Sequence, residues 1–346
     1  MATAVSTVRC LEVEPGRARV RDAAPPPLPD GWGRVRVSAC GVCGTDLHLL
    51  HGMELPRHCS YPLRPGHEVA GRVIEGSAGR VRLGDQVVLH PLIPCGRCDA
   101  CRSDHENRCR YATRLGFDHP GGLAEEIVWP LHRMVPTPRL PPKQAAVLPD
   151  AVASAYHALK LAELPAGGAL TVLGAGGVGI HVLALARVLD PTARLTAVVR
   201  SPGSEQRLRR LGLDAAILLG ADDVGRRVLG RGGPQDAVIE FGAGAHALAQ
   251  ATPMLARGGR LVVGSMSEEP LDLGASLAQL VTRELYVIGS YASTIADLGA
   301  VVHLATTGRL DLSASVSHQL PLERAAEAFE LLERRPTGLA RVVVVP

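Results

Sequence analysis

Hydrophobic and polar positions are arranged differently in the two parts of this chain. Between residues 31 and 90, short apolar and β-branched runs alternate with glycine and proline, and strands are expected at 34–39, 68–75 and 86–90. Short runs with frequent interruptions are typical of a compact β unit with irregular connections. The first part of the chain is therefore predicted to be an all-β domain.

After residue 150 the pattern changes to apolar helices that alternate with short apolar strands. A helix is expected at 151–161. Strands are expected at 170–174, 195–199, 215–219, 237–241, 261–264 and 286–289. Strands separated by Ala- and Leu-rich helices form βαβ units, and right-handed crossovers join them into one parallel sheet. Residues 151–290 are predicted to form a doubly wound domain, and the chain is placed in the α/β class.

Beyond residue 290 the predicted elements are a helix, a polar stretch, a second helix at 322–333 and a final strand at 340–345. Composition agrees with two domains, because 346 residues of which 46% are hydrophobic can bury a sizeable core. The 37 Lys and Arg residues nearly balance the 34 Asp and Glu residues, so nucleic acid is not expected as a partner. Glycine and charge interrupt the apolar runs, and no leader pattern is recognised, so a cytoplasmic protein without membrane contact is expected.

Four of the eight cysteines fall within fifteen residues, at Cys95, Cys98, Cys101 and Cys109. In a reducing compartment this spacing favours a metal over disulfides, and four sulfur ligands suit tetrahedral zinc. A site with four protein ligands is closed, so its role is expected to be structural. An iron–sulfur cluster is an alternative that the spacing also permits, and unligated cysteines are a weaker one.

A glycine-rich loop follows the strand expected at 170–174 and precedes an apolar helix. Its residues are Gly174, Ala175, Gly176, Gly177, Val178 and Gly179. Glycines let the backbone turn tightly and approach a pyrophosphate, while the helix N-terminus attracts the anion. Within a βαβ unit the loop predicts dinucleotide binding, and a glycine-rich turn without a ligand is the alternative.

Cys43 and His67 supply a thiol and an imidazole from two glycine-marked loops, each next to a predicted strand. Either residue alone is unremarkable, because a single Cys or His is more often a packing residue than a metal ligand. Together with a four-cysteine cluster and a nucleotide loop in the same chain, the pair indicates a second metal site.

In motif order, this sequence resembles the zinc-containing medium-chain dehydrogenases, which include alcohol, polyol and threonine dehydrogenases. The resemblance rests on GVCGTDLH, GHE, the four-cysteine segment, GAGGVG and Arg341. It implies a GroES-like catalytic domain formed by residues 1–150 and 291–346, with a structural zinc lobe at about 95–109. A Rossmann domain at 151–290 would interrupt it, and Arg341 would contact the cofactor.

The resemblance also implies a catalytic zinc. Cys43 and His67 match ligand positions, Glu68 matches a carboxylate that can approach the metal, and the third protein ligand falls on Asp150. The sequence departs here from the commoner Cys or Glu. Asp150 before an apolar helix is also a suitable N-cap, and one carboxylate can serve both roles.

Further roles follow from the same resemblance. Thr45 would contact the alcohol oxygen and pass its proton through the cofactor ribose to His48, while Asp46 would orient His67 or, alternatively, form an Asx turn. The expected chemistry is hydride transfer between a nicotinamide and a secondary alcohol, polyol or aminocyclitol, or the carbonyl, with two zinc ions per chain. A homodimer or homotetramer is expected. A zinc-stabilised nucleotide-binding protein without activity is the alternative, which the intact site residues disfavour.

Side chains after the second strand of the βαβ domain bear on cofactor choice. An NAD enzyme usually carries an acid there to bind the ribose hydroxyls, but Val199 falls at that position. Arg200 can pair with a 2′-phosphate and the Ser201 hydroxyl can donate to it, so NADP(H) is favoured over NAD(H). The alternative is a solvent-facing Arg200 and use of NAD.

The substrate pocket is less determined by the sequence. Residues 55–61, Phe117 and Trp129 are candidates for its lining, and each could equally belong to the core or the surface.

Overall fold

The computed structural model describes residues 7–199, 202–209, 211–213, 215–218, 223–267 and 270–346. The chain divides into two compact units, one formed by Met1–Asp150 with Thr294–Pro346 and the other by Ala151–Ser293. The sequence-based expectation put these boundaries after residues 150 and 290. None of the helices in the described ranges is long and apolar enough to cross a membrane.

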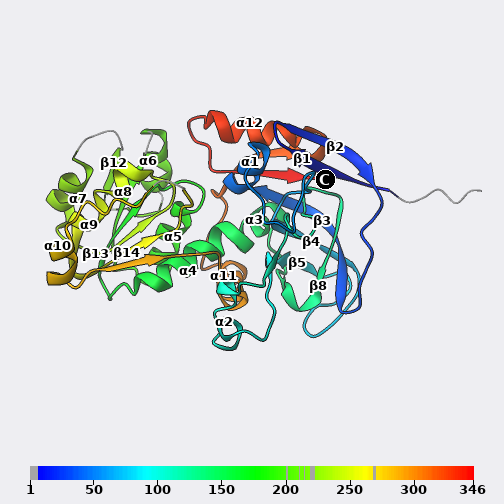
Figure 1. The fold of residues 1–346 in the computed structure, drawn as a ribbon, viewed down its shortest axis with the longest axis horizontal. Helices are drawn as coiled ribbons and strands as arrows, with labels where there is room; N and C mark the ends of the chain where they lie inside the picture. The colour runs from blue at the N-terminus through cyan, green and yellow to red at the C-terminus, as the bar shows by residue number, and fades with distance from the viewer. Residues whose placement is uncertain (1–6, 200–201, 210, 214, 219–222, 268–269) are drawn as a thin grey trace, which may run out of the picture. The chain divides into compact units, whose positions relative to one another are not determined.

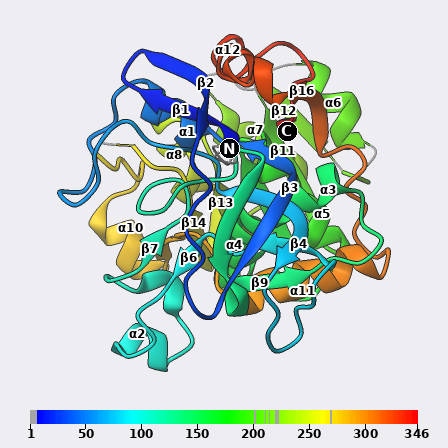
Figure 2. The same ribbon diagram turned by 90° about the vertical axis from the view of Figure 1, so that its right-hand side faces the viewer.

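The first unit is built on a seven-stranded sheet in the order β16-β17-β3-β4-β5-β9, with β8 paired to β3. Its strands are β3 (Trp32–Val42), β4 (Glu68–Glu75), β5 (Gln86–Leu89), β8 (Glu126–Pro130), β9 (Met134–Pro136), β16 (Val316–Pro321) and β17 (Arg341–Val345). The eleven-residue β3 is its long central strand (Figure 2). Because β17 pairs antiparallel with β3, the C-terminal segment completes a sheet that the N-terminal segment begins.

Shorter elements surround this sheet. They are the hairpin β1 (Val8–Glu14) and β2 (Arg17–Ala23), the pair β6 (Leu92–Ile93) and β7 (Thr113–Arg114), and helices α1 (Gly44–Leu50), α2 (Asp99–Arg102), α3 (Pro142–Ala146), α11 (Ile295–Thr306) and α12 (Ala326–Arg334). Single helical turns lie at η1 (Glu106–Arg108), η2 (Leu131–Arg133), η3 (Leu148–Val152) and η4 (Leu322–Arg324). Trp129, Phe329 and Leu11 are among the large side chains buried in the core.

The second unit holds a six-stranded sheet in the order β12-β11-β10-β13-β14-β15, in which every pair is parallel. Its strands are β10 (Ala169–Leu173), β11 (Arg194–Val199), β12 (Ala215–Leu218), β13 (Gln235–Glu240), β14 (Leu255–Val263) and β15 (Tyr286–Gly289). In chain order this is the 3-2-1-4-5-6 arrangement of a Rossmann sheet. The predicted doubly wound parallel sheet is therefore confirmed.

Helices cover both faces of the parallel sheet (Figure 1). They are α4 (Ala153–Ala162), α5 (Gly179–Leu189), α6 (Pro202–Arg209), α7 (Val224–Gly232), α8 (Ala245–Leu248), α9 (Ala251–Met254) and α10 (Leu277–Thr282). Apolar strands such as β10, in which all five residues are buried, suit a sheet that is covered on both sides.

Three elements differ from the sequence-based expectation. The segment after Cys43 is the helix α1 rather than a loop, the polar stretch contains the edge strand β16, and β14 begins at Leu255 rather than 261. In β16 half-buried and exposed positions alternate, as expected of an edge strand with one solvated face, but its polar side chains obscure this period in the sequence. The last residue of the strand expected at 215–219 lies outside the described residues.

Candidate metal sites and nucleotide-binding elements

Four side chains predicted as ligands of an open metal site converge in the first unit. Candidate ligand atoms of Cys43, His67, Glu68 and Asp150 all lie within 4.8 Å of one another. Cys43 follows β3 and His67 precedes β4, and the antiparallel register of these strands pairs Gly41 with Glu68. Sheet pairing thus joins two motifs that are separated in sequence.

The spacing of these atoms fits a tetrahedral cation. The Asp150 Oδ2 atom lies 3.6 Å from the Cys43 sulfur and 3.5 Å from His67 Nε2. Zinc bonds of about 2.0–2.3 Å place neighbouring tetrahedral ligands about 3.3–3.8 Å apart. Cys43, His67 and Asp150 therefore have the donor types and the separations of a three-ligand zinc site that keeps one position open.

A single buried carboxylate, that of Asp46, holds the two ligand loops together. Its Oδ2 atom accepts the Cys43 backbone N–H at 2.8 Å, and Oδ1 accepts the Gly66 backbone N–H at 3.1 Å. Oδ1 also lies 3.6 Å from His67 Nδ1, which leaves Nε2 directed toward Asp150. Asp46 is completely buried, so its position is fixed. An outer carboxylate of this kind orients a ligating imidazole.

Glu68 and Arg341 form a buried ion pair beside the three ligands. The Arg341 guanidinium donates to Glu68 Oε1 and to Asp150 Oδ2, the latter at 3.4 Å. The other Glu68 oxygen is buried, and no group among the described residues donates a hydrogen bond to it. A side chain at Gly41 would collide with this oxygen. Arg341, expected to contact the cofactor, is directed in this structure at the carboxylates of Glu68 and Asp150.

The surroundings shift the pKa values of Cys43, Asp150 and Glu68 in different directions. Burial raises the pKa of the Cys43 thiol, but Arg341 and His67 more than offset this and bring it below its usual range. Burial also raises the pKa of Asp150, and the pairing with His67 and Arg341 brings it well below its usual value. For Glu68 burial prevails, and its pKa lies well above the usual range. Arg341 and His67 thus favour the ionised forms of Cys43 and Asp150, whereas burial works against ionisation at all three groups.

The residues expected to handle the proton lie on α1. Thr45 Oγ1 lies 3.8 Å from the Cys43 sulfur, in the first turn of the helix. His48 is exposed in the last turn. The Thr45 hydroxyl thus lies next to the Cys43 sulfur, and the His48 imidazole is in contact with water.

Asp150 does not occupy the N-cap position of helix α4, which was the alternative interpretation of this residue. Helix α4 begins at Ala153 with Val152 at the N-cap position and no side-chain capping bond. Asp150 instead lies within the π-helical turn Leu148–Val152. Such turns are frequent at functional sites because they redirect a side chain.

The four-cysteine cluster lies in the segment that contains α2 and η1. The sulfurs of Cys98 and Cys101 are 3.4 Å apart, and those of Cys95 and Cys101 are 4.0 Å apart. The backbone N–H of Arg97 contributes most to lowering the pKa of Cys95 to about 6, whereas burial and neighbouring sulfurs raise the pKa of Cys101 to about 12. A dication bound among them would favour the thiolate form of all four.

The glycine loop lies between β10 and α5, as the dinucleotide motif requires. Gly174 has a φ of +86°, and a side chain there would collide with the carbonyl oxygen of Phe241. A side chain at Gly179 would collide with the carbonyl of Gly174, whereas Gly176 faces open space. Gly177 and Val178 complete the turn before the eleven-residue α5. The glycines permit this turn and leave the backbone accessible to a phosphate.

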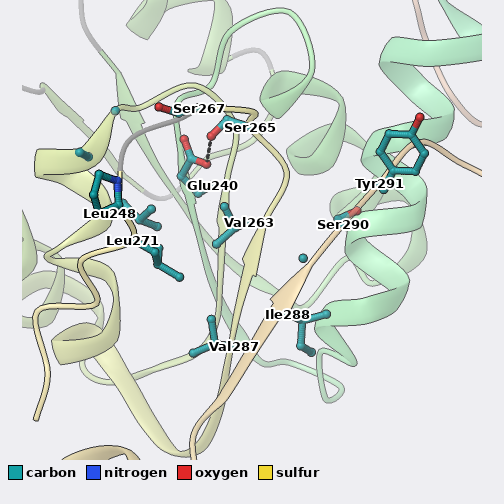
Figure 3. Close-up of a pocket in the computed structure, with 14 residues that line it drawn as sticks. Glu240, Leu248, Val263, Ser265, Ser267, Leu271, Val287, Ile288, Ser290 and Tyr291 are labelled. Atoms are coloured by element: carbon teal, nitrogen blue, oxygen red, sulfur yellow. Dashed lines mark hydrogen bonds between the residues drawn. The ribbon is translucent and has the colours of Figure 1, made fainter. Parts of the chain in front are cut away.

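A cavity of about 510 Å³ opens at the carboxyl ends of β13, β14 and β15 in the same unit (Figure 3). The buried Glu240 carboxylate accepts hydrogen bonds from the Ala243 backbone N–H at 2.8 Å and from the Ser265 hydroxyl. Val263, Ile288 and Tyr291 line other parts of the wall. Open α/β sheets bind ligands at these strand ends. The residues that line this cavity were not predicted from the sequence, because they come from three strand ends far apart in the chain and form no compact motif.

The residues predicted for cofactor choice and for the substrate pocket are not found lining a site in the described part of the structure. Arg200 and Ser201 lie outside the described residues, and Val199 is the buried last residue of β11. Trp129 is completely buried and donates its indole N–H to the His90 carbonyl at 2.9 Å, so it belongs to the core. Phe117 packs against the same core while partly exposed.

Comparison with known proteins gives consistent matches over nearly the whole chain. Residues 29–139 match the family model described as alcohol dehydrogenase GroES-like domain, and residues 177–307 match zinc-binding dehydrogenase. An alcohol dehydrogenase of Geobacillus stearothermophilus is 30% identical over 319 residues, which cover 91% of this chain and 92% of the relative. L-galactonate-5-dehydrogenase of Escherichia coli (strain K12) is 27% identical over 309 residues, covering 88% and 89%.

A solved structure from Sinorhizobium meliloti 1021, described as a zinc-binding dehydrogenase bound to NADP, superposes with a TM-score of 0.89. It is 28% identical, and the match covers 99% of this chain and 100% of that one. The similarity therefore includes both units.

Proposed function

Because the chain belongs to the zinc-containing medium-chain dehydrogenase family, we propose that it transfers hydride between a nicotinamide cofactor and a secondary alcohol, polyol or aminocyclitol, or the corresponding carbonyl compound. The observation that supports this most strongly is the convergence of Cys43, His67 and Asp150 with tetrahedral spacing. The similar alcohol dehydrogenase and L-galactonate-5-dehydrogenase support this choice of substrate class.

We assign two zinc ions to each chain. Cys43, His67 and Asp150 would hold one, with Glu68 able to approach it, and Cys95, Cys98, Cys101 and Cys109 would hold the other. A zinc ion held by the first set would supply a Lewis acid for the substrate oxygen, and a bound nicotinamide would supply the hydride donor or acceptor. None of the eight cysteines forms a disulfide in the structure, in line with a location in the reducing cytoplasm.

The protein's own groups would orient the reactants and move the proton. Asp46 holds the backbones of Cys43 and Gly66 by hydrogen bonds and lies 3.6 Å from His67 Nδ1, so the ligand loops would be in place before any substrate arrives. Thr45, beside the Cys43 sulfur, would relay the substrate's hydroxyl proton, taking it up on Oγ1 as it gives up its own proton toward His48. His48, exposed on the same helix, would release that proton to water. An inactive zinc-stabilised protein would not need all of these groups.

The test is a panel of alcohols, polyols and aminocyclitols with each oxidised nicotinamide, and of ketones with each reduced one, followed by absorbance of the reduced cofactor. Turnover with at least one member of the panel is expected. Absence of turnover in zinc-loaded protein across the whole panel would support the inactive alternative.

Asp150→Asn is expected to lower zinc content at the open site and to lower kcat/KM by about tenfold or more. Asparagine keeps the shape of the side chain but loses the negative charge that pairs with His67 and the cation. Metal analysis and steady-state kinetics measure the two effects. Unchanged zinc content and activity in this variant would remove Asp150 from the ligand set.

We further propose that NADP(H) is preferred over NAD(H). Val199 ends β11 where an acid would bind the ribose hydroxyls of NAD, so no carboxylate there repels a 2′-phosphate. Arg200 and Ser201 follow it in the sequence and can bind that phosphate. The solved relative from Sinorhizobium meliloti holds NADP, in line with this proposal.

Arg200→Ala is expected to lower kcat/KM with NADP by about tenfold or more and to leave kcat/KM with NAD nearly unchanged, because only the phosphorylated cofactor presents the charge. Kinetics with both cofactors give the ratio directly. A wild type that prefers NAD would contradict the role of Arg200. So would an Arg200→Ala variant whose ratio of kcat/KM for NADP to kcat/KM for NAD equals that of the wild type.

A homodimer or homotetramer is also proposed. Leu277 and Val281 of α10 are 76% and 64% exposed, and Tyr286 and Val287 of the edge strand β15 are also exposed. Apolar side chains gathered at a sheet edge favour contact with a second copy. Sedimentation of the purified protein should give a multiple of the 36.4 kDa chain mass, and a monomer at micromolar concentration would contradict the proposal.

A further inference from the structure

A third group of ligating side chains lies outside both metal sites described above. Candidate ligand atoms of His58, Cys59 and Asp118 lie within 4.8 Å of one another, although the two segments that carry them are far apart in sequence. The Cys59 thiol donates to Asp118 Oδ1 at 3.4 Å, and His58 Nε2 is hydrogen-bonded to the same oxygen. None of the three takes part in the proposed hydride transfer.

The carboxylate of Asp118 is held in place. Its Oδ2 atom accepts the backbone N–H of Arg114 at 2.7 Å and the Arg114 guanidinium at 2.9 Å, and only 5% of its side chain is exposed. Burial raises the pKa of Asp118, but Arg114 and His58 outweigh it, so the net pKa is below its usual value. The group is thus a fixed, ionised carboxylate with Oδ1 directed at His58 and Cys59.

The chemistry of the three groups is that of a zinc site with one open position. Imidazole nitrogen, thiolate sulfur and carboxylate oxygen are the ligand types that zinc prefers in proteins. His58 is 66% exposed, so a cation can reach the group from solvent and the imidazole has room to move to ligand distance. Zinc binding would release the Cys59 proton to solvent.

We propose that His58, Cys59 and Asp118 form an additional zinc-binding site of lower affinity than the other two. The affinity is lower because the 66% exposed His58 side chain must be ordered when the ion binds, whereas His67 is already buried beside Asp46. A bound ion would cross-link residues 58–59 to the turn at 114–119 through its ligands. Gly121 and Gly122, just after this turn, donate backbone N–H groups to Arg64 and Gly66 at 2.7 and 2.8 Å, so the cross-link would restrain the segment that leads to His67.

Equilibrium dialysis of the full chain against zinc, followed by elemental analysis, tests the proposal. With zinc in micromolar excess, the wild type is expected to hold one more equivalent per chain than Cys59→Ser or His58→Ala. His51→Ala is the matched control, because His51 is an exposed imidazole 2.7 Å from the Glu333 carboxylate and has no cysteine partner. It should retain the additional equivalent.

Cobalt(II) added to the zinc-loaded protein supplies a second readout. Wild type and His51→Ala should gain the thiolate-to-cobalt absorption band, whereas Cys59→Ser should not. Circular dichroism verifies that each variant is folded. Equal zinc uptake by wild type and Cys59→Ser, or an unchanged cobalt band in that variant, would overturn the proposal. Both measurements are made without turnover, so their outcome is separate from that of the proposed activity.

Discussion

His67→Ala should lose one zinc ion per chain and lower kcat/KM by about a thousandfold or more, which corresponds to about 4 kcal/mol of transition-state stabilisation. The imidazole contributes a ligand atom 3.5 Å from Asp150 Oδ2, and alanine offers no replacement. Cys43 and Asp150 would remain, and Glu68 is paired with Arg341, so the site would lack the three firm protein ligands of an open zinc site.

The fold should survive this substitution, because the strands that carry the ligands are joined by backbone hydrogen bonds that His67 does not make. Elemental analysis, steady-state kinetics and thermal unfolding of the same preparation separate these effects. His51→Ala, a substitution of an exposed histidine, serves as the control and should leave both zinc ions and turnover in place. Full activity in His67→Ala would refute the assignment of the open site.

Cys98→Ser should lose the other zinc ion and lower the free energy of unfolding by about 4 kcal/mol or more, a size seen when a structural metal is lost. The segment around the four cysteines has short helices and little apolar surface of its own. The loss should extend beyond the cluster, because Glu106 accepts the Ile295 backbone N–H at 2.7 Å and lies 3.6 Å from Arg133. The cysteine segment therefore anchors the first turn of α11.

Chemical and thermal unfolding, with elemental analysis before and after, measure this change. Ser103→Ala is the control, because Ser103 is a polar residue of the same segment and is not a proposed metal ligand. This variant should keep both zinc ions. A wild-type protein that contained iron and inorganic sulfide would instead favour the cluster alternative. Unchanged metal content and stability in Cys98→Ser would show that the four cysteines are not a metal site.

The parallel sheet was predictable because most of its strands are short apolar runs between helices, and the runs at 170–174 and 195–199 correspond to β10 and β11. The edge strand β16 was not recognised, because half of its side chains face water and it needs β17 for pairing. Helix α1 was missed for a similar reason. It begins where Asp46 accepts the Cys43 N–H, and that bond depends on the side-chain geometry of a short segment.

Candidate ligands could be named from their types and from glycine-marked motifs, but their arrangement could not. The position of Arg341 against Glu68 depends on the pairing of β17 with β3, which joins the two ends of the chain. The cavity beside Glu240 combines residues from three strand ends, and the group of His58, Cys59 and Asp118 combines two distant segments. Such sites arise from long-range contacts that local patterns do not encode.

Direct hydride transfer that depends on the open metal site is the central claim, and deuterium labelling tests it most directly. The best alcohol from the panel, labelled on its carbinol carbon, is incubated with zinc-loaded protein and oxidised nicotinamide, and the products are examined by NMR. The deuterium is predicted to appear at C4 of the reduced nicotinamide, with the transfer abolished in His67→Ala. Deuterium released to solvent, or transfer at an equal rate in His67→Ala, would contradict the account.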